Sequence, residues 1–113
     1  MEARATSKYI RVSPQKARLV VDLIRGKNAG EAVNILRFTK KRASLEIAKI
    51  LRSAISNAEQ KSEHLDVDRL FVSRAYVDEG PRMKRIRPAP MGRAYRYQRR
   101  MSHITVVVEE QEG

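Results

Sequence analysis

The feature that most limits how this chain can fold is the stretch Gly80–Arg100, which reads GPRMKRIRPAPMGRAYRYQRR. It contains three prolines and two glycines, so it cannot form a helix and is predicted to turn back on itself. Strand-like runs lie on both sides of it, at Arg69–Val77 and His103–Val108. We therefore predict a long β-hairpin over residues 78–102, called the basic arm below. A disordered basic tail is the alternative, but ordered-looking sequence resumes after the stretch.

The basic arm also holds most of the net charge. From residue 81 to residue 100 there are eight basic side chains and no acidic one, whereas the other 93 residues hold 16 basic and 13 acidic side chains. The segment thus supplies +8 of the formal net charge of +11. Like charges at this density repel one another, which predicts a partner of opposite sign, nucleic acid before anionic membrane.

Composition limits the rest of the chain. A length of 113 residues predicts one domain, and 42% hydrophobic with only 5% aromatic residues predicts an aliphatic core. Cysteine is absent, which excludes disulfides and thiolate metal sites. No apolar stretch approaches the roughly 20 residues that span a bilayer, and the N-terminus lacks the apolar core of a secretory signal. We expect no membrane partner and a cytoplasmic location.

The first half of the chain predicts a strand and two helices. The strand covers Ala3–Val12. A helix then starts at Ser13-Pro14 and runs to about Arg25, with Ala17, Val20, Val21 and Ile24 on its apolar face and Gly26 as a left-handed stop. The pair Asn28 and Glu31 has the form of a capping box and opens a short helix that ends near Phe38.

A third helix is predicted from Lys41 to Gln60, with Thr39 as its cap and the stripe Ile47, Leu51, Ala54, Ile55 and Ala58. We interpret the helices as scaffold. After the arm, Ile104, Val106 and Val108 alternate as the inward face of a strand, and the acidic tail from Glu109 is expected to fray.

The predicted fold class is α+β: a small three-stranded antiparallel sheet packed with three helices, with a long projecting β-hairpin. We expect one domain over residues 1–113, with a globular body at 1–77 and 103–113 and the hairpin at 78–102.

Arginine and lysine in such an arm bind RNA phosphates, and guanidinium groups also stack on unpaired bases. The predicted phosphate-binding residues of the arm are Arg82, Lys84, Arg85, Arg87, Arg93, Arg96, Arg99 and Arg100. Tyr95 and Tyr97 are candidates for base stacking, with stiffening of the hairpin as the alternative. A second RNA surface on the body is predicted around the first strand and helix, where Lys8 and Arg11 accompany the candidate site residues Lys16, Arg18, Arg25 and Lys27. Plain solubilising charge is the alternative.

The sequence argues against catalysis. Two histidines, His64 and His103, have no cysteine or spaced partner for a metal, and the adjacent Asp78 and Glu79 would point to opposite faces of a strand. We expect no metal and no cofactor. The strongest rival function is an architectural DNA-binding protein whose basic β-arm wedges a tip proline between base pairs. Such proteins are usually compact dimers, and we expect no obligate homo-oligomer here. A membrane-active cationic protein would need a basic amphipathic helix.

Six motifs occur in order along nearly the whole chain: SPQKARLV from Ser13, DLIRGK from Asp22, YVDEGP from Tyr76, MKRI from Met83, GRA from Gly92 and SHITV from Ser102. With them the chain resembles a bacterial member of the large-subunit ribosomal protein family numbered twenty-two. At the tip, Arg87-Pro88-Ala89-Pro90-Met91 departs from the usual pattern, as do Tyr95, Tyr97 and Gln98.

The resemblance implies a ribosomal, cytoplasmic protein that binds several domains of the large-subunit ribosomal RNA and acts early in subunit assembly. It implies neighbouring large-subunit proteins and the nascent peptide as partners, because the hairpin of this family lines the peptide exit tunnel. The residues that would face the tunnel at the tip are Met83, Ile86, Pro88, Ala89, Pro90, Met91 and Gly92.

Overall fold

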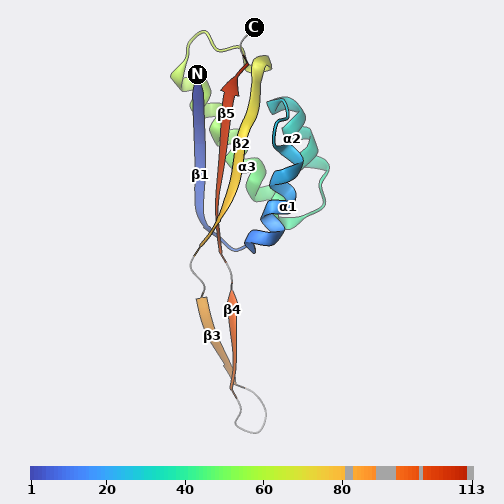
Figure 1. Cartoon of the computed structure of the whole chain (residues 1–113), viewed down its shortest axis with the longest axis vertical. Coiled ribbons are helices and arrows are strands. Elements are labelled where there is room, and N and C mark those ends of the chain that lie inside the picture. The colour runs from blue at the N-terminus through green and yellow to red at the C-terminus, as the bar shows by residue number, and fades with distance from the viewer. Residues whose placement is uncertain (81–82, 89–93, 100, 112–113) are drawn as a thin grey trace.

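The structure, a computed structural model, describes residues 1–80, 83–88, 94–99 and 101–111, and it describes only the backbone of 83–88 and 94–99. The elements in chain order are β1 (Glu2–Ile10), α1 (Pro14–Ile24), α2 (Ala29–Phe38), α3 (Arg42–Lys61), β2 (Leu70–Glu79), β3 (Met83–Pro88), β4 (Ala94–Arg99) and β5 (Ser102–Glu110). A 3-10 turn, Val67–Arg69, precedes β2. The helices form one layer over a sheet, and β3 and β4 project beyond the sheet (Figure 1).

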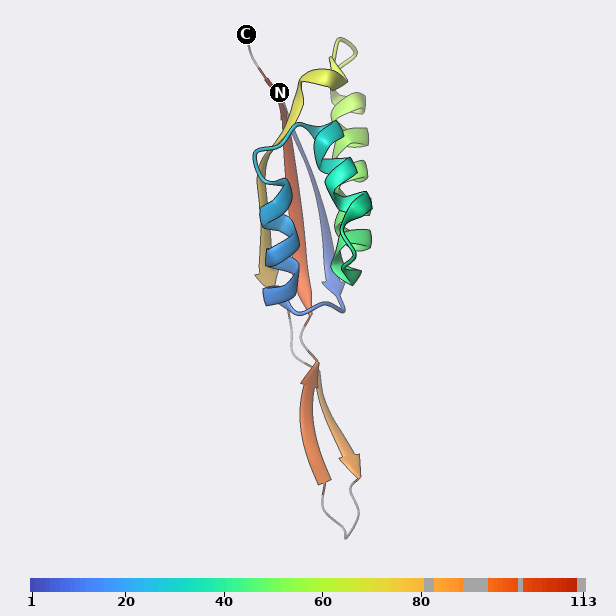
Figure 2. The ribbon, with the colours of Figure 1, turned by 90° about the vertical axis from the view of Figure 1, so that its right-hand side faces the viewer.

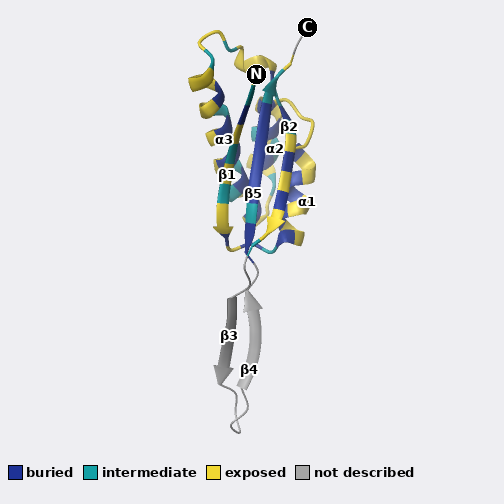
Figure 3. Cartoon of the chain, turned by 60° about the vertical axis from the view of Figure 1, so that its left-hand side comes forward, coloured by how far each residue is buried: buried dark blue, intermediate teal, exposed yellow. Residues whose placement is uncertain are grey.

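The sheet of the body has the strand order β1-β5-β2, and both pairings are antiparallel. The last strand of the chain is therefore the central one, and it is buried along most of its length (Figure 3). Ile104, Val106 and Val108 belong to the core cluster, as their alternation predicted. The expected fraying from Glu109 is wrong for the first two residues of that tail, because Glu109 pairs with Glu2 and Phe71, and β5 continues to Glu110.

Local signals fix the two ends of α1. Ser13 precedes the helix, and its Oγ accepts a hydrogen bond from the amide of Lys16 at 3.3 Å. Gly26, just beyond the helix, has φ of +80°, a conformation that strains any residue with a Cβ. Both features agree with the sequence-based prediction.

The starts of the other two helices differ from their predictions. Asn28 does cap α2, but its Oδ1 accepts from the amide of Gly30 at 2.9 Å rather than from the third helical residue as in a capping box. Thr39 as the cap of α3 is wrong. Its Oγ1 donates to the carbonyl of Ile35 at 2.6 Å, and the N-cap position of α3 is Lys41, whose side chain makes no capping hydrogen bond.

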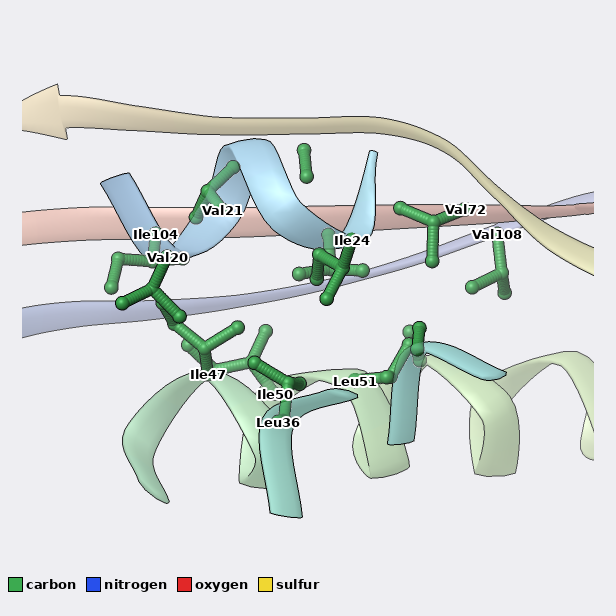
Figure 4. Close-up of a cluster of buried hydrophobic side chains, with 14 of the residues drawn as sticks. Val20, Val21, Ile24, Leu36, Ile47, Ile50, Leu51, Val72, Ile104 and Val108 are labelled. Atoms are coloured by element: carbon green, nitrogen blue, oxygen red, sulfur yellow. The ribbon is translucent and has the colours of Figure 1, made fainter. Parts of the chain in front are cut away.

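The core lies between the helices and the inner face of the sheet. Val20, Val21 and Ile24 from α1 meet Leu36 from α2 and Ile47, Ile50 and Leu51 from α3, over Val72, Ile104 and Val108 of the sheet (Figure 4). Burying each large aliphatic side chain contributes about 1.5–3 kcal/mol. Alanines fully buried at the helix contacts permit close approach of the layers; they are Ala17, Ala32, Ala54 and Ala58. This aliphatic core is the one that the composition predicted.

The base of the basic arm is tied to the body at three points. The Oγ of Ser102, fully buried, donates to the carbonyl of Val12 at 2.6 Å, and the amide of Gly80 donates to the carbonyl of Met101 at 2.8 Å. On the far side of β5, the amide of Tyr9 donates to Nδ1 of His103 at 3.1 Å. The two chains that enter the arm are thus fixed at its root.

The α+β fold class, the three-stranded antiparallel sheet and the three helices on one face are confirmed. Figure 2 shows the helices in front of the three strands of the sheet, with β3 and β4 continuing away from one end of the body.

Candidate nucleic-acid interface

The projecting hairpin consists of two paired strands. β3 and β4 are antiparallel, and their register runs from Met83 opposite Arg99 to Pro88 opposite Ala94. The two strands hold five cations and no acid, namely Lys84, Arg85, Arg87, Arg96 and Arg99. With the hairpin, the principal extents of the molecule are 67 × 25 × 16 Å. A narrow, acid-free ribbon of this kind can run along a groove between phosphate backbones.

The strand register also relates the two tyrosines to two of the arginines. Tyr95 lies opposite Arg87, and Tyr97 lies opposite Arg85. Directly opposite positions in an antiparallel pair have Cβ atoms about 4.5–5.5 Å apart. At two points of the ribbon, a tyrosine position and an arginine position are therefore neighbours, and these two residue types together suit contact with a base and its phosphate.

Several predicted site residues lie outside the described part of the chain: Arg82, Arg93, Arg100, Ala89, Pro90, Met91 and Gly92. The others on the arm are placed by their backbone alone: Met83, Lys84, Arg85, Ile86, Arg87, Pro88, Tyr95, Arg96, Tyr97 and Arg99. Their roles stay predictions.

Two of the predicted body cations cap the outer edge of β2. The guanidinium of Arg18 donates to the carbonyl of Val77 at 3.1 Å. The guanidinium of Arg25 donates twice to the carbonyl of Ala75, at 3.2 and 2.7 Å, and its Nη1 pairs with Asp22 at 2.6 Å. An edge strand presents unpaired backbone groups, and charged side chains are one way to cover them. Arg18 and Arg25 therefore have a structural contact that sequence reasoning did not foresee.

The opposite edge of the sheet is covered in the same manner by α3. Asn57 donates to the carbonyl of Arg4 at 2.9 Å, and the ammonium of Lys61 donates to the carbonyl of Glu2 at 2.9 Å. Polar side chains from the first and third helices thus protect the two edge strands. Such long-range pairs leave no periodic signal in the sequence.

The other two predicted body cations, Lys16 and Lys27, are exposed at opposite ends of α1. The four residues thus follow the whole length of the helix rather than forming one cluster. Near Lys16 the fold adds two cations that the predicted interface left out, Lys41 and Arg42 at the start of α3. The signal that could have drawn attention to them is the basic, acid-free start of the third predicted helix.

Other kinds of site find little support in the part of the chain with described side chains. Within it, no group of three or more histidine, aspartate or glutamate residues is placed to hold a metal ion. None of the described helices is both long enough and apolar enough to cross a bilayer.

Comparison with known proteins gives a consistent result. Residues 5–109 match the family described as ribosomal protein L22p/L17e. The large ribosomal subunit protein uL22 of Solibacter usitatus is 63% identical over 113 residues, covering 100% of both chains. The uL22 proteins of Halothermothrix orenii, 59% identical over 97% of this chain and 96% of its own, and of a Thermoanaerobacter species, 56% identical over 99% and 100%, are similarly close. The chain, with its basic hairpin held out from a small α+β body, therefore belongs to the ribosomal protein L22p/L17e family.

Proposed function

We propose that this protein is a structural constituent of the large ribosomal subunit, in the cytoplasm, and that it binds large-subunit ribosomal RNA. The observation that carries the proposal is family membership over nearly the full length, together with a stretch of the arm, residues 81–100, that holds eight cations and no acid. Close relatives bear the name of a large ribosomal subunit protein. A segment so rich in cations cannot form a hydrophobic core of its own. Phosphates of a surrounding RNA would neutralise its charges, which accounts for its composition.

In this proposal the hairpin contacts several RNA domains, while the body rests on the subunit beside neighbouring proteins. Binding that orders the arm between RNA segments would join them early in assembly. The tip, from Met83 to Gly92, borders the peptide exit tunnel and the nascent chain. Apolar residues in this stretch, such as Met83, Ile86 and Met91, suit an RNA crevice or the tunnel lumen.

Binding preference tests the RNA assignment. The protein is titrated with a large-subunit ribosomal RNA transcript and, separately, with random duplex DNA of the same length at the same salt concentration. We expect a clear preference for the RNA, with a steep salt dependence of about −0.7 per phosphate contact. Equal or tighter binding to the duplex would favour an architectural DNA-binding protein instead.

The tunnel assignment needs its own test. The chain has no cysteine, so one introduced by Met91→Cys is the sole thiol. In assembled subunits, a cross-linker on this thiol should capture a stalled nascent peptide. A cysteine at Glu59→Cys, exposed on α3, is the matched control and should capture none. Capture from the control alone would place the nascent chain at the body and contradict the tunnel role of the tip.

A further inference from the structure

A cleft at the arm end of the body is lined by cations from two distant segments. Its volume is about 500 Å³, within the usual range of ligand sites. One wall is the connection from β1 into α1, and the other is the start of α3. The described lining residues are Arg11, Val12, Ser13, Lys16, Leu19, Lys41, Arg42 and Ala43, four of them basic and none acidic. This set is called the cationic cleft below.

The four cations of the cleft are Arg11, Lys16, Lys41 and Arg42, and all are exposed. The side-chain ion pairs among described residues join Glu2 to Arg4 and Arg74, Asp22 to Arg25, and Glu46 to Lys49, so none of them neutralises the cleft. Glu46 lines a neighbouring hollow together with Arg11 and Arg42, but it is not part of the described lining of the cleft. Four like charges in a lining without an acid raise the local affinity for an anion.

The charges also oppose the ordinary electrostatics of a helix start. The positive end of the helix dipole favours acidic residues, each by about 0.3–1 kcal/mol, and disfavours cations. Both α1, of 11 residues, and α3, of 20 residues, begin at the cleft with no acid in the first turn. Instead, Lys16 lies in the first turn of α1 and Arg42 begins α3. Figure 2 shows both helices starting at the end of the body from which the hairpin leaves. Cations in place of acids at two helix starts beside one cleft form an arrangement that an external anion would stabilise.

The apolar lining residues of the cleft, and its position near the root of the arm, indicate which kind of anion would fit. Leu19, which is 54% exposed, lines the cleft together with the buried Val12 and Ala43, so the lining combines cations with apolar side chains. A nucleotide offers this combination of charged phosphate with ribose and base. The carbonyl of Val12 in turn accepts the hydrogen bond from Ser102 at the root of the arm. A strand that follows the arm toward the body would therefore meet the cleft next.

We propose that the cationic cleft binds the phosphodiester backbone of an RNA strand, as a second contact that is already formed in the folded body. This rests on the proposed RNA-binding function. It assigns an RNA contact to Lys41 and Arg42, and it gives Arg11 and Lys16, already part of the predicted second RNA surface, partners across the cleft. Phosphates lie between the two basic walls, within reach of the first-turn amides of α3, and the apolar lining residues receive a ribose or base.

Two double variants of the full-length chain test the cleft. Lys41→Gln with Arg42→Gln removes one lysine and one arginine from it. Lys49→Gln with Arg52→Gln removes the same charges from an exposed part of the same helix. In titrations with large-subunit ribosomal RNA, the first pair should lower the salt slope by about 1.4 and weaken binding about 25-fold at about 0.1 M salt, for two contacts at roughly 0.7 each. The second pair should stay within about twofold of the unaltered chain.

The outcomes separate this proposal from the one it rests on. Equal weakening by both pairs, or none by either, would overturn the cleft while leaving RNA binding by the arm intact. Failure of the unaltered chain to bind the RNA would overturn the proposed function and the RNA assignment of the cleft together.

A direct measurement completes the test. Inorganic pyrophosphate, titrated into the unaltered protein, should shift the amide resonances of Arg42 and Ala43 in a saturable way. The shift should vanish in the Lys41→Gln, Arg42→Gln chain and persist in the control pair. If the amide resonances of Arg42 and Ala43 shift no more than those of Lys49 and Arg52, the cleft is not an anion-binding site and the proposal is wrong. Tighter binding of polyglutamate than of RNA at these amides would assign the cleft to an acidic protein segment and contradict the proposal.

Discussion

Every helix and strand of the body contributes buried aliphatic side chains to one core cluster. By contrast, the sequence between residues 81 and 100 holds eight cations and three prolines, and its two described strands, β3 and β4, pair only with each other. A core stabilises itself by removing apolar surface from water. An isolated two-stranded ribbon is marginal in water, and self-repulsion among its cations weakens it further. The body is thus stabilised by its own hydrophobic core, whereas we expect the arm to be stabilised by the phosphates of a bound partner.

Cations within the body show the same division on a smaller scale. Arg18 and Arg25 donate to the carbonyls of β2 and thus serve the fold. Arg11, Lys16, Lys41 and Arg42 have no acid among the described lining of their cleft and thus favour an external anion. Charge alone does not reveal which group a residue belongs to, but its hydrogen-bond partner does.

Neutralising the arm should produce the largest effect. Changing Lys84, Arg85, Arg87 and Arg96 to glutamine would remove four of the proposed phosphate contacts, and we expect the RNA affinity to fall by several hundred-fold at about 0.1 M salt. The free energy of unfolding of the body should not fall, because no core residue is altered. Filter binding and thermal unfolding measure the two quantities.

A control of equal charge keeps this test specific. Glutamine at Arg4, Arg37, Lys49 and Arg52 also removes three arginines and one lysine, all exposed on the body. Its loss of affinity should be far smaller. If both sets of substitutions lowered the RNA affinity equally, the arm would act only through net charge. The proposed difference between arm and body would then be wrong.

Truncating the core should affect stability alone. Leu51 on α3 is fully buried, so Leu51→Ala should lower the free energy of unfolding by about 2–5 kcal/mol. Leu45→Ala on the same helix removes the same atoms from a side chain that is 70% exposed. This control should change the free energy of unfolding by less than about 0.5 kcal/mol. Urea unfolding measures both. If Ile86→Ala on the arm destabilised the protein as much as Leu51→Ala, the arm would share the core and the comparison would be wrong.

The root of the arm should respond to an intermediate degree. Ser102→Ala deletes the donor at 2.6 Å from the carbonyl of Val12 and leaves that acceptor unsatisfied in a buried place. The expected loss is about 1–3 kcal/mol in the free energy of unfolding. Ser53→Ala, exposed on α3, should be near neutral. An unchanged stability of Ser102→Ala in denaturant titrations would show that the arm root contributes nothing to the body.

Replacing an edge-capping arginine should have the smallest effect. Arg25→Gln removes the two donors to the carbonyl of Ala75 and the contact with Asp22, at a site that is about half exposed. We expect a loss of about 1 kcal/mol in thermal unfolding, since exposed ion pairs contribute little. RNA affinity should fall less than for Lys16→Gln. The reverse order would show that Arg25 binds RNA in preference to holding the sheet.

The features of the fold that could be predicted from the sequence are those set by contacts between residues close together in the chain. Ser13 and Gly26 bound α1 through contacts within a few residues, and both predictions were confirmed. Thr39 failed because its hydroxyl had a nearer acceptor, the carbonyl of Ile35 in the preceding turn, a competition that the sequence does not decide. The helix stripes were predictable because a helical period repeats every turn.

An aliphatic body with a strongly basic arm could be predicted from the sequence, because periodicity, prolines and charge density are all properties of neighbouring residues. The capping of β2 by Arg18 and Arg25, and the cleft that brings the start of α3 to Lys16, became visible only in the folded chain. Those contacts join segments 25 to 60 residues apart in the chain. Their geometry follows from packing the helices on the sheet, which no local pattern encodes.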